Sequence, residues 1–319
     1  MTLAEKLEQA RAGAAFGPPL LRGLLRLSGK HRVPFLHRIS TQRLAKLEPG
    51  EAAYTAFLDV KAHVVAEGTV LAREDHLVVD VAAEAAEPLV AYLRKYIIMD
   101  DVKVQPLGDA LRVLPVFGER AIAVATQVAG DAPSFETSRH GAPARDFILS
   151  PEDAERVRSA LAGAGAAELA EAELEALRVM AGVPRWGAEL DGARLVLETG
   201  IVRDSVSFDK GCYIGQEVVA RGTFRGQIQR GLVQLAVPAG TPTPSALTVE
   251  GQEVGTVTSV AETPEGSLAL GYLRRAHWTE GQRLAVAGGE AVVRRVLVEE
   301  RDAPEARRGG LLSRPPASR

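Results

Sequence analysis

Residues 210–217 of the chain read Lys210-Gly211-Cys212-Tyr213-Ile214-Gly215-Gln216-Glu217. Cys212 is the single cysteine of the sequence, and the glycines around it allow the backbone to turn tightly. A thiolate forms near pH 7 only where positive charge or helix N-terminal N–H groups stabilise it. Lys210 supplies such a charge, and the residues after Gly215 are suited to begin a helix. The stretch predicts a nucleophilic thiol; the alternative is an inert cysteine buried in a turn.

The sequence that follows has the pattern of short antiparallel strands. Apolar residues alternate with small ones over 268–272, as in a strand with one buried face. Glycine-containing pairs at 250–251 and 288–289 are typical of hairpin turns. Five or six strands between 232 and 298 predict a small antiparallel barrel or sandwich. Residues 302–319 are rich in Pro, Arg and Gly, which predicts a disordered tail.

The sequence before the stretch alternates between β-rich runs and helical patterns. Strands are expected at 24–27, 54–59, 64–71, 76–81, 102–104 and 111–116. Helices are expected at 31–47, at 88–96, after Ser150 and at 170–181. Ser150 can cap the first N–H groups of its helix, and Pro151 fits the first helical turn. This alternation predicts an α+β region in which helices cover one face of a single sheet.

Length and composition narrow the classes of function. With 319 residues the chain can form two or three domains, and its net charge of −3 argues against direct nucleic-acid binding through overall charge. One cysteine cannot form an internal disulfide, and no two of the six histidines have the spacing of a helical metal pair, so no metal site is expected. Neither a signal peptide nor an apolar stretch of ~20 residues is visible, which predicts a cytoplasmic protein without membrane contact.

Residues 210–217 match, residue for residue, the K-G-C-Y-x-G-Q-E signature of the YgfZ family. These are folate-binding proteins similar to the T-protein, the aminomethyltransferase of the glycine cleavage system. The segments 34–41, 57–62 and 177–187 also resemble family motifs, with Ala62 where the family usually has Gly. The resemblance covers residues 22–297.

This resemblance implies a T-protein-like α+β fold of three modules around a folate channel, ending in an antiparallel β-barrel. It divides the chain into a folate-binding region of two modules at 1–228, a barrel at 229–300 and a disordered tail at 301–319. The implied cofactor is tetrahydrofolate or a related folate.

The resemblance also implies folate-binding residues. A pterin ring presents an N–H and an NH₂ group on one edge, and a carboxylate can accept both in a bidentate pair. Asp146 stands where the T-protein-like pattern has a carboxylate ahead of its L-R segment, so we expect it to bind the pterin edge. Arg178 of that segment is expected to support the ring or the acidic tail, since guanidinium groups pair well with carboxylates. Glu198 and Arg139 are further candidates.

The implied function is that of an accessory factor in the assembly or repair of iron–sulfur enzymes, including enzymes that modify tRNA. Cys212 and Lys210 would be its reactive pair, and its partners would be iron–sulfur client or assembly proteins. One alternative is a folate-dependent aminomethyltransferase or demethylase, although Ala66 and Glu67 stand where the T-protein pattern has an Asp pair. The other alternative is an interaction protein whose folate site is vestigial.

A basic stripe follows the signature and consists of Arg221, Arg225 and Arg230. Its guanidinium groups are suited to folate carboxylates or to an acidic partner. A solvated surface is the simpler interpretation, and the sequence alone leaves these alternatives open.

Overall fold

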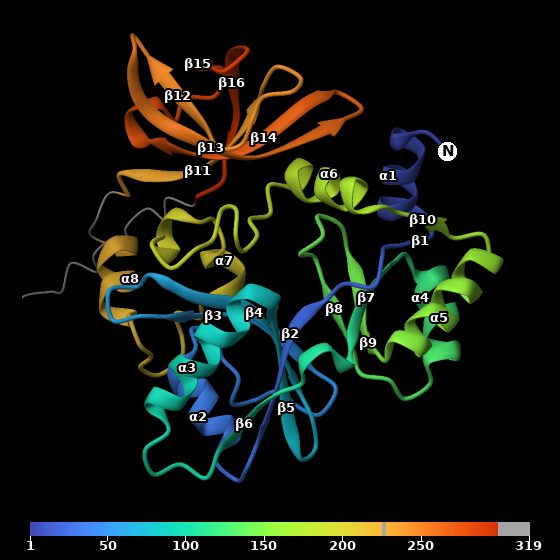
Figure 1. Cartoon of the computed structure of the whole chain (residues 1–319). Helices are drawn as coiled ribbons and strands as arrows, with labels where there is room; N and C mark the ends of the chain where they lie inside the picture. The colour runs from blue at the N-terminus through green and yellow to red at the C-terminus, as the bar shows by residue number, and fades with distance from the viewer. Residues whose placement is uncertain (225–227, 299–319) are drawn as a thin grey trace, which may run out of the picture.

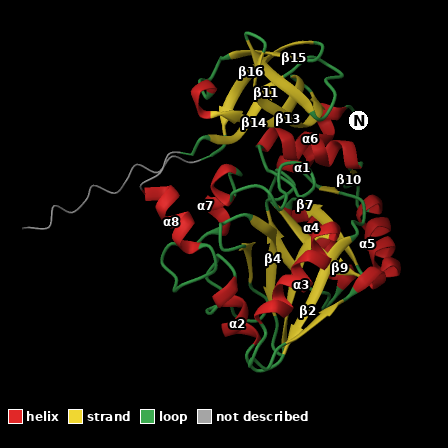
Figure 2. Cartoon of the chain, turned by 60° about the vertical axis from the view of Figure 1, so that its left-hand side comes forward, coloured by secondary structure: helices red, strands yellow, loops and turns green. Residues whose placement is uncertain are grey.

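Three groups of strands organise the chain (Figure 1). The computed structural model describes residues 1–224 and 228–298; the predicted tail at 301–319 and Arg225 of the basic stripe lie outside the described residues. The described part contains two five-stranded sheets and a closed six-stranded barrel. The barrel stands on helices α1 and α6, with the sheets beneath them (Figure 2).

The first sheet is formed by the β-rich runs near the N-terminus, and its antiparallel strands lie in the order β3-β4-β5-β2-β6. Its strands are β2 (Arg22–Ser28), β3 (Ala52–Leu58), β4 (Val64–Ala72), β5 (His76–Ala82) and β6 (Lys103–Pro106). The helical elements over it are α2 (Arg32–Ile39), η1 (Ala83–Ala85) and α3 (Ala86–Tyr96). The strands match the first five predicted runs, with ends that differ by at most two residues.

Side chains of β5 alternate between two very different surroundings. Val79 and Val81 point to the face that α2 and α3 cover, and they share one apolar core with these helices. Val78 points to the opposite face and packs against the second sheet. Asp80, two residues further along, must lie on the same face as Val78. A charged side chain is thereby directed into the space between the two sheets.

Helix α2 is shorter than the predicted helix at 31–47. Pro34 lies in its first turn, where a missing N–H does no harm because that group has no partner within the helix. The helix ends at Ser40, whose backbone is extended, with φ of −109° and ψ of 164°. Its last carbonyls are then free to accept hydrogen bonds from elsewhere in the chain.

The second sheet has the order β10-β1-β7-β9-β8. Its strands are β1 (Ala15–Phe16), β7 (Arg112–Phe117), β8 (Ser134–Thr137), β9 (Ala144–Leu149) and β10 (Ala167–Glu168). The helical elements around it are α1 (Leu3–Ala12), η2 (Gly108–Ala110), α4 (Glu119–Ala129) and α5 (Pro151–Gly163). The hydroxyl of Ser150 accepts a hydrogen bond from the backbone N–H of Asp153 at 3.0 Å, so the predicted cap of α5 is confirmed.

The single sheet expected from the sequence is in fact two sheets that face each other. Leu24 and Val78 of the first sheet pack against Val113, Phe135 and Ile148 of the second. The chain leaves the first sheet at its edge strand β6 and enters the second at β7, with η2 between them. Alternation along each strand identifies the strand but not its neighbours, which explains the difference.

The remaining segments connect the sheets to the barrel. The connecting helices are α6 (Glu171–Ala181), η3 (Val196–Glu198), α7 (Val202–Ser205) and α8 (Gln216–Phe224). The barrel contains β11 (Arg230–Ala236), β12 (Ser245–Val249), β13 (Gln252–Thr263), β14 (Gly266–Arg274), η4 (Arg275–His277), β15 (Arg283–Val286) and β16 (Gly289–Val296). It closes because β16 pairs with β11, which decides between the barrel and the sandwich. The predicted boundary at 229 lies one residue before β11.

Helix α6 is fastened to the barrel through buried polar contacts. Arg178 donates to the carboxylate of Glu189 at 2.9 Å and to the hydroxyl of Ser259 in β13 at 2.8 Å. Gln234 of β11 donates to the carbonyl oxygens of Val179 and Met180 at 2.6 and 3.0 Å. These contacts set the position of the barrel over the second sheet.

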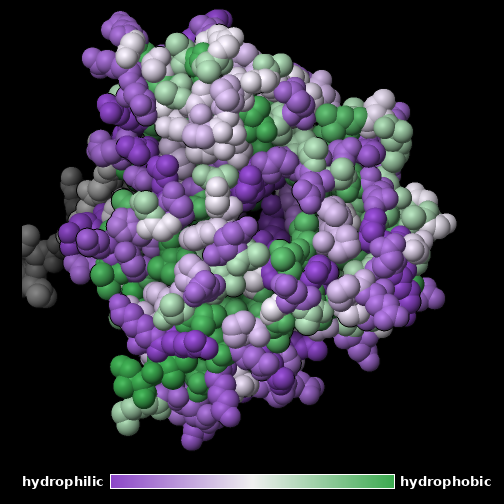
Figure 3. Space-filling view, in the orientation of Figure 1, coloured by the Kyte–Doolittle hydropathy of each residue, from purple (hydrophilic) through white to green (hydrophobic). Residues whose placement is uncertain are grey.

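The space-filling view shows a hollow lined by hydrophilic side chains between the barrel and the sheets (Figure 3). Such a hollow is consistent with the central channel that the family resemblance implies. Within residues 1–224 and 228–298, no helix is both long and apolar enough to cross a bilayer.

The contact between α6 and the barrel gives a testable prediction. Glu189 is fully buried, so Glu189→Gln leaves the guanidinium of Arg178 without one of its counter-charges. We expect the free energy of unfolding to fall by about 3 kcal/mol, the scale for breaking a buried ion pair. Urea denaturation measures this free energy. The control is Glu290→Gln, which breaks an exposed ion pair with Arg283 of the barrel. It should lower the free energy of unfolding by less than about 1 kcal/mol. Equal losses in both variants would contradict the structural role given to Arg178.

Candidate functional site

An ion-pair cluster around Arg139 joins the inner faces of the two sheets. Nη1 of Arg139 lies 2.5 Å from Oδ2 of Asp80 in β5, and Nη2 contacts the carboxylate of Asp146 in β9. The Nε of Arg22, at the start of β2, lies 2.8 Å from the other oxygen of Asp80. The side chains of Asp80 and Asp146 are 1% and 0% exposed. Both buried carboxylates therefore depend on Arg139 for compensation of their charge.

Asp146 remains ionised at physiological pH despite its burial. His140 Nε2 lies 3.0 Å from Oδ1 of Asp146, beside the contact with Arg139. Burial alone would raise the pKa of Asp146, but the charge of Arg139 and the contact with His140 outweigh it and lower the pKa to about 2. An ionised carboxylate is the form that accepts the two N–H groups of a pterin edge.

Glu67 is the third carboxylate of this cluster. It lies on β4 opposite Ala56 of β3, and its carboxylate interacts with the hydroxyl of Tyr54. Desolvation raises the pKa of Glu67. The positive charges of Arg22 and Arg139 offset this rise only in part. Unlike Asp80 and Asp146, Glu67 keeps partial exposure. It is thus the most exposed carboxylate of the cluster.

The donors and acceptors of the cluster fit a pterin ring. Nη2 of Arg139 is buried and, among the described residues, has no well-directed hydrogen bond in spite of its contact with Asp146. The three carboxylates outnumber the two guanidinium groups of Arg22 and Arg139. A ligand that offers N–H donors together with an acceptor would satisfy both features, and a pterin ring offers both.

The predicted site residues are only partly brought together. Asp146 and Arg139 are in contact, as a shared site requires. Arg178 lies outside the cluster, and its guanidinium binds Glu175, Glu189 and other groups at the barrel junction. A folate contact by Arg178 stays a prediction.

Glu198 lies in a separate cavity of about 510 Å³ between η3 and the barrel. Burial raises the pKa of Glu198, and the positive charges of Arg230 and Arg194 partly offset this effect. Since this cavity is not lined by the cluster around Arg139, a role of Glu198 in binding the pterin ring stays a prediction.

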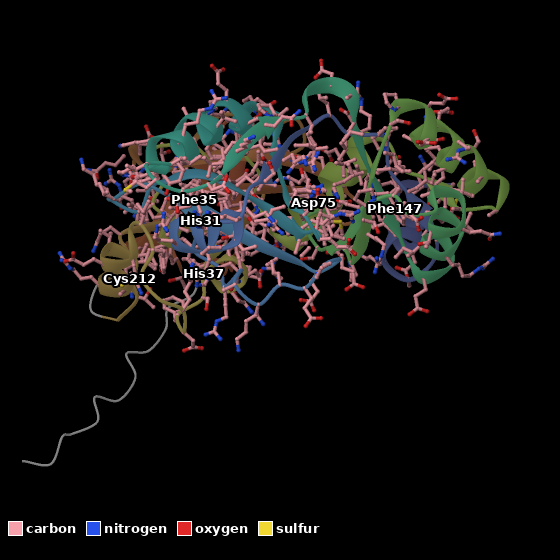
Figure 4. The ribbon with its side chains drawn as sticks, turned by 90° about the horizontal axis from the view of Figure 1, so that it is seen from below. His31, Phe35, His37, Asp75, Phe147 and Cys212 are labelled. Atoms are coloured by element: carbon pink, nitrogen blue, oxygen red, sulfur yellow. The ribbon has the colours of Figure 1, made fainter. Side chains whose placement is uncertain are left out.

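Cys212 is exposed. In the view from below it lies across the molecule from Phe147, the neighbour of Asp146 in β9 (Figure 4). Helix α8 begins at Gln216, where the sequence indicated a helix start. The thiol is open to a partner protein.

Lys210 anchors the cysteine loop to the end of α2. Its Nζ donates to the carbonyl oxygens of His37, Ser40 and Gln42 at 2.5, 2.6 and 3.0 Å. Burial lowers the pKa of Lys210 to about 8. The ammonium group is thus directed at backbone carbonyls, and activation of the Cys212 thiol by its charge stays a prediction.

The cysteine loop also rests on the turn at 59–62, which belongs to another of the family-like motifs. Gly215 has a φ of +82°, and a Cβ atom there would lie 2.7 Å from the carbonyl oxygen of Asp59. Ala62 has a φ of +65°, a left-handed conformation that favours glycine. The glycine usual in the family at this position therefore has a conformational reason, and Ala62 adopts the same conformation at some cost.

Sequence reasoning missed three members of the cluster: Asp80, Arg22 and His140. Asp80 had a readable signal, because an acid interrupts an otherwise apolar run at 77–82. Arg22 and His140 had none, because Arg22 reaches Asp80 from the neighbouring strand β2 and His140 reaches Asp146 from the connection between β8 and β9.

Comparison with known proteins agrees with this architecture. Residues 22–145 match the GCVT N-terminal domain, and residues 229–297 match the C-terminal β-barrel domain of CAF17. The crystal structure of the glycine cleavage system aminomethyltransferase T from Bartonella henselae has a TM-score of 0.78, with 20% identity over 94% of this chain and 90% of that chain. The chain has a T-protein-like fold, and its C-terminal barrel is of the CAF17 type.

Proteins of similar sequence also support the resemblance to the YgfZ family. The tRNA-modifying protein YgfZ of Yersinia pestis (strain Pestoides F) is 28% identical over 264 residues, which cover 77% of this chain and 79% of that protein. A chloroplastic protein of Arabidopsis thaliana is 27% identical over 286 residues, or 83% of this chain. The match spans 66% of the Arabidopsis protein, just under two thirds of its length. The resemblance to the YgfZ family and the predicted fold class are confirmed.

The ionisation of Asp146 gives a prediction for stability. A carboxyl group whose pKa falls from 3.8 to about 2 on folding adds about 2 kcal/mol to stability above pH 4, because the unfolded chain binds more protons between these two values. We expect Asp146→Asn to lose this amount at pH 7. The difference from the unchanged protein should shrink as pH falls from about 4 towards 2.

Unfolding by urea at a series of pH values tests this prediction. Asp109→Asn removes an exposed carboxylate in η2 and serves as the control. We expect it to change neither the free energy of unfolding at pH 7 nor its dependence on pH. If the free energies of unfolding of Asp146→Asn and the unchanged protein differ by the same amount down to pH 2.5, the carboxylate is not held ionised by Arg139 and His140.

Proposed function

We propose that the protein binds tetrahydrofolate and acts as an accessory factor for iron–sulfur enzymes, among them enzymes that modify tRNA, in the cytoplasm. The observation that carries the proposal is the buried cluster of Asp146, Arg139 and Glu67. It lies between the two sheets; Glu67 and Arg139 belong to the segment that matches the GCVT N-terminal domain, and Asp146 directly follows that segment. The similarity to proteins named tRNA-modifying protein YgfZ supports the link to tRNA modification.

Three side chains of the cluster would hold the folate. Asp146 would accept hydrogen bonds from the pterin edge, and Nη2 of Arg139 would donate to a ring acceptor in exchange for part of its contact with Asp146. Glu67, which is partly exposed, would face the ring from β4. Tetrahydrofolate, when bound, supplies a carrier for one-carbon groups.

Cys212 would serve a different task from the folate site. Its exposed thiolate would act as one ligand to iron of a cluster held by the client protein, while the client supplies the other ligands. Lys210 would be a positioning residue, because its three hydrogen bonds fix the cysteine loop against α2. The separation of Cys212 from Phe147, the chain neighbour of Asp146, supports two independent tasks (Figure 4).

A second candidate is a folate-dependent aminomethyltransferase or demethylase. The raised pKa of Glu67, next to the proposed pterin site, favours it, because a carboxyl group that retains its proton more readily is suited to proton transfer. Turnover of a methylamine substrate with tetrahydrofolate, lost in Glu67→Gln and kept in Cys212→Ser, would favour this candidate over the accessory factor.

Calorimetry with tetrahydrofolate tests the binding site. We expect Asp146→Asn to weaken binding roughly thirtyfold, the equivalent of about 2 kcal/mol for a lost charge-assisted hydrogen-bond pair. Glu136→Gln, which changes an exposed carboxylate of β8, is the matched control and should bind normally. Unchanged affinity in Asp146→Asn together with a loss in Glu67→Gln would assign the pterin edge to Glu67. No binding to the unchanged protein would favour the interaction protein with a vestigial site.

Complementation of cells that lack the native protein tests the thiol. Cys212→Ser changes sulfur to oxygen with little change in volume, so tetrahydrofolate affinity and stability should stay within twofold and about 0.5 kcal/mol of the unchanged protein. Activity of the iron–sulfur client should fall to the level of cells without the protein, because a serine hydroxyl does not ionise at neutral pH. Full client activity at matched protein levels would remove Cys212 from the mechanism.

A further inference from the structure

Large apolar side chains are exposed at one end of the first sheet. Val60, Ile98 and Met99 lie in the turns that follow β3 and α3, and Ile98 and Met99 are 85% and 92% exposed. Hydrophobic residues gather at the lower left of the space-filling view, where Figure 1 draws α2 and α3 (Figure 3). Because turns are normally polar, apolar side chains gathered in them indicate a contact for another molecule.

The turn at 97–101 is fixed to α2. The guanidinium of Arg38 lies 3.0 Å from the carboxylate of Asp100. Near the start of α2, the backbone N–H of Asp101 donates to Nδ1 of His31 at 2.9 Å. The apolar side chains of this turn are thereby presented in one arrangement before a partner arrives, which lowers the entropic cost of binding.

The cysteine loop is fixed to the same helix. Lys210 binds carbonyl oxygens at the end of α2. Ile214 of the cysteine loop and Ile97 after α3 pack against the same apolar core of the first sheet. Cys212 lies at the same end of the molecule as His37 of α2 (Figure 4). The exposed thiol and the exposed apolar turn are thus both anchored to one helix of 8 residues, which is about 12 Å long.

Val60 lies in a third segment that meets the same elements. Gly215 of the cysteine loop packs against the turn that carries Val60. The hydroxyl of Tyr92 in α3 donates to the carbonyl oxygens of Leu58 and Ile39 at 2.9 and 3.2 Å, which ties the end of β3 to α3 and α2. The three segments with exposed apolar or thiol groups therefore share one rigid support.

Positive charge accompanies the apolar side chains. Lys61 lies in the turn after β3, and Arg94 and Lys95 lie in the last turn of α3. All three are exposed, and within the part of the chain that the structure describes none of them forms an ion pair. The carboxylates of Asp59 and Asp100 are already paired inside the protein. A partner with acidic groups around an apolar centre complements this surface.

We propose that Val60, Ile98 and Met99 form, together with Cys212, the surface on which the iron–sulfur client docks; this inference rests on the proposed function. The client places an apolar face with an acidic rim against these side chains and thereby brings its cluster to the thiol. A standard interface buries ~800 Å² on each partner, which is enough to cover both sides of a helix as short as α2. The flexible side chain of Met99 can adapt to more than one client.

The charges favour a client protein over a membrane or a second copy of the chain. Asp100 and Asp101 directly follow Met99, and an anionic lipid surface would repel their carboxylates. In a symmetric dimer the same surface meets itself, so the cations Lys61 and Lys95 would face like charges. A protein of different sequence can place its carboxylates where the cations are.

Expression at graded levels in cells that lack the native protein tests this surface. Ile98→Ser/Met99→Ser weakens docking but keeps the thiol. Client activity should therefore be lost at the lowest level at which the unchanged protein restores it, and should return at a level about tenfold higher or more. Cys212→Ser should stay inactive at every level. Because Ile98 and Met99 are exposed, the melting temperature and the tetrahydrofolate affinity should not change.

A pair of charge reversals tests the acidic rim of the client. Lys61→Glu/Lys95→Glu should also raise the level of protein that restores client activity. The matched control is Arg120→Glu/Arg294→Glu, which makes the same change of charge at exposed positions of α4 and β16. It should act like the unchanged protein, and equal effects of both pairs would overturn the acidic rim.

Full client activity of Ile98→Ser/Met99→Ser at the lowest effective level would overturn the docking surface. So would loss of activity at every level, because a higher concentration restores docking that is only weakened. Co-sedimentation of the unchanged protein, but not of this double variant, with vesicles of phosphatidylethanolamine and phosphatidylglycerol would assign the side chains to a membrane. A dimer that the double variant loses in analytical ultracentrifugation would assign them to a second copy.

Failure of the proposed function has a different signature. Full activity of Cys212→Ser would contradict the role given to the thiol. The expression level at which Ile98→Ser/Met99→Ser restores client activity would still decide whether the client docks on the apolar turn.

Discussion

The structure depends on one buried guanidinium. Arg139 contacts Asp80 of the first sheet and Asp146 of the second, and neither carboxylate has access to solvent. Without Arg139, Asp80 would keep only Arg22 and Asp146 only His140 as charged or polar partners, and the two buried carboxylates would repel each other across the sheets. The apolar side chains of the two inner faces, such as Val78 and Ile148, share one core.

The same constraint explains why a polar site can exist between two packed sheets. The cluster holds three carboxylates against two guanidinium groups and one histidine, so its acceptors have room for further N–H donors. A ligand that supplies them binds where the protein has already met the cost of burying the charges. The position of Glu67, at the partly exposed side of the cluster, gives such a ligand a way to make contact.

Much of the local structure could be predicted from the sequence, for reasons that are themselves local. The cap at Ser150 and the strand at 76–81 depend on neighbours in the chain, and both predictions were confirmed. The partition of the strands into two sheets depends on contacts between distant segments, and the prediction of a single sheet was wrong. In the site, Asp146 was found through its motif, but its partner Asp80 and the anchoring role of Lys210 became visible only in three dimensions. A lysine two residues from a cysteine favoured an electrostatic interpretation, whereas the backbone places its ammonium group against the end of α2.

The pairing of β1 has a consequence for synthesis of the chain. β1 lies at residues 15–16, but it pairs with β7 at 112–117 and with β10 at 167–168. Helix α1 buries Leu7 and Ala10 only in the core that these later segments complete. Residues 15–16 must therefore wait, unpaired, until residues 112–117 and 167–168 have also been made, while the first sheet can assemble from residues 22–106 alone. Residues 3–16 are thus made before the strands of the first sheet but are built into the fold after them.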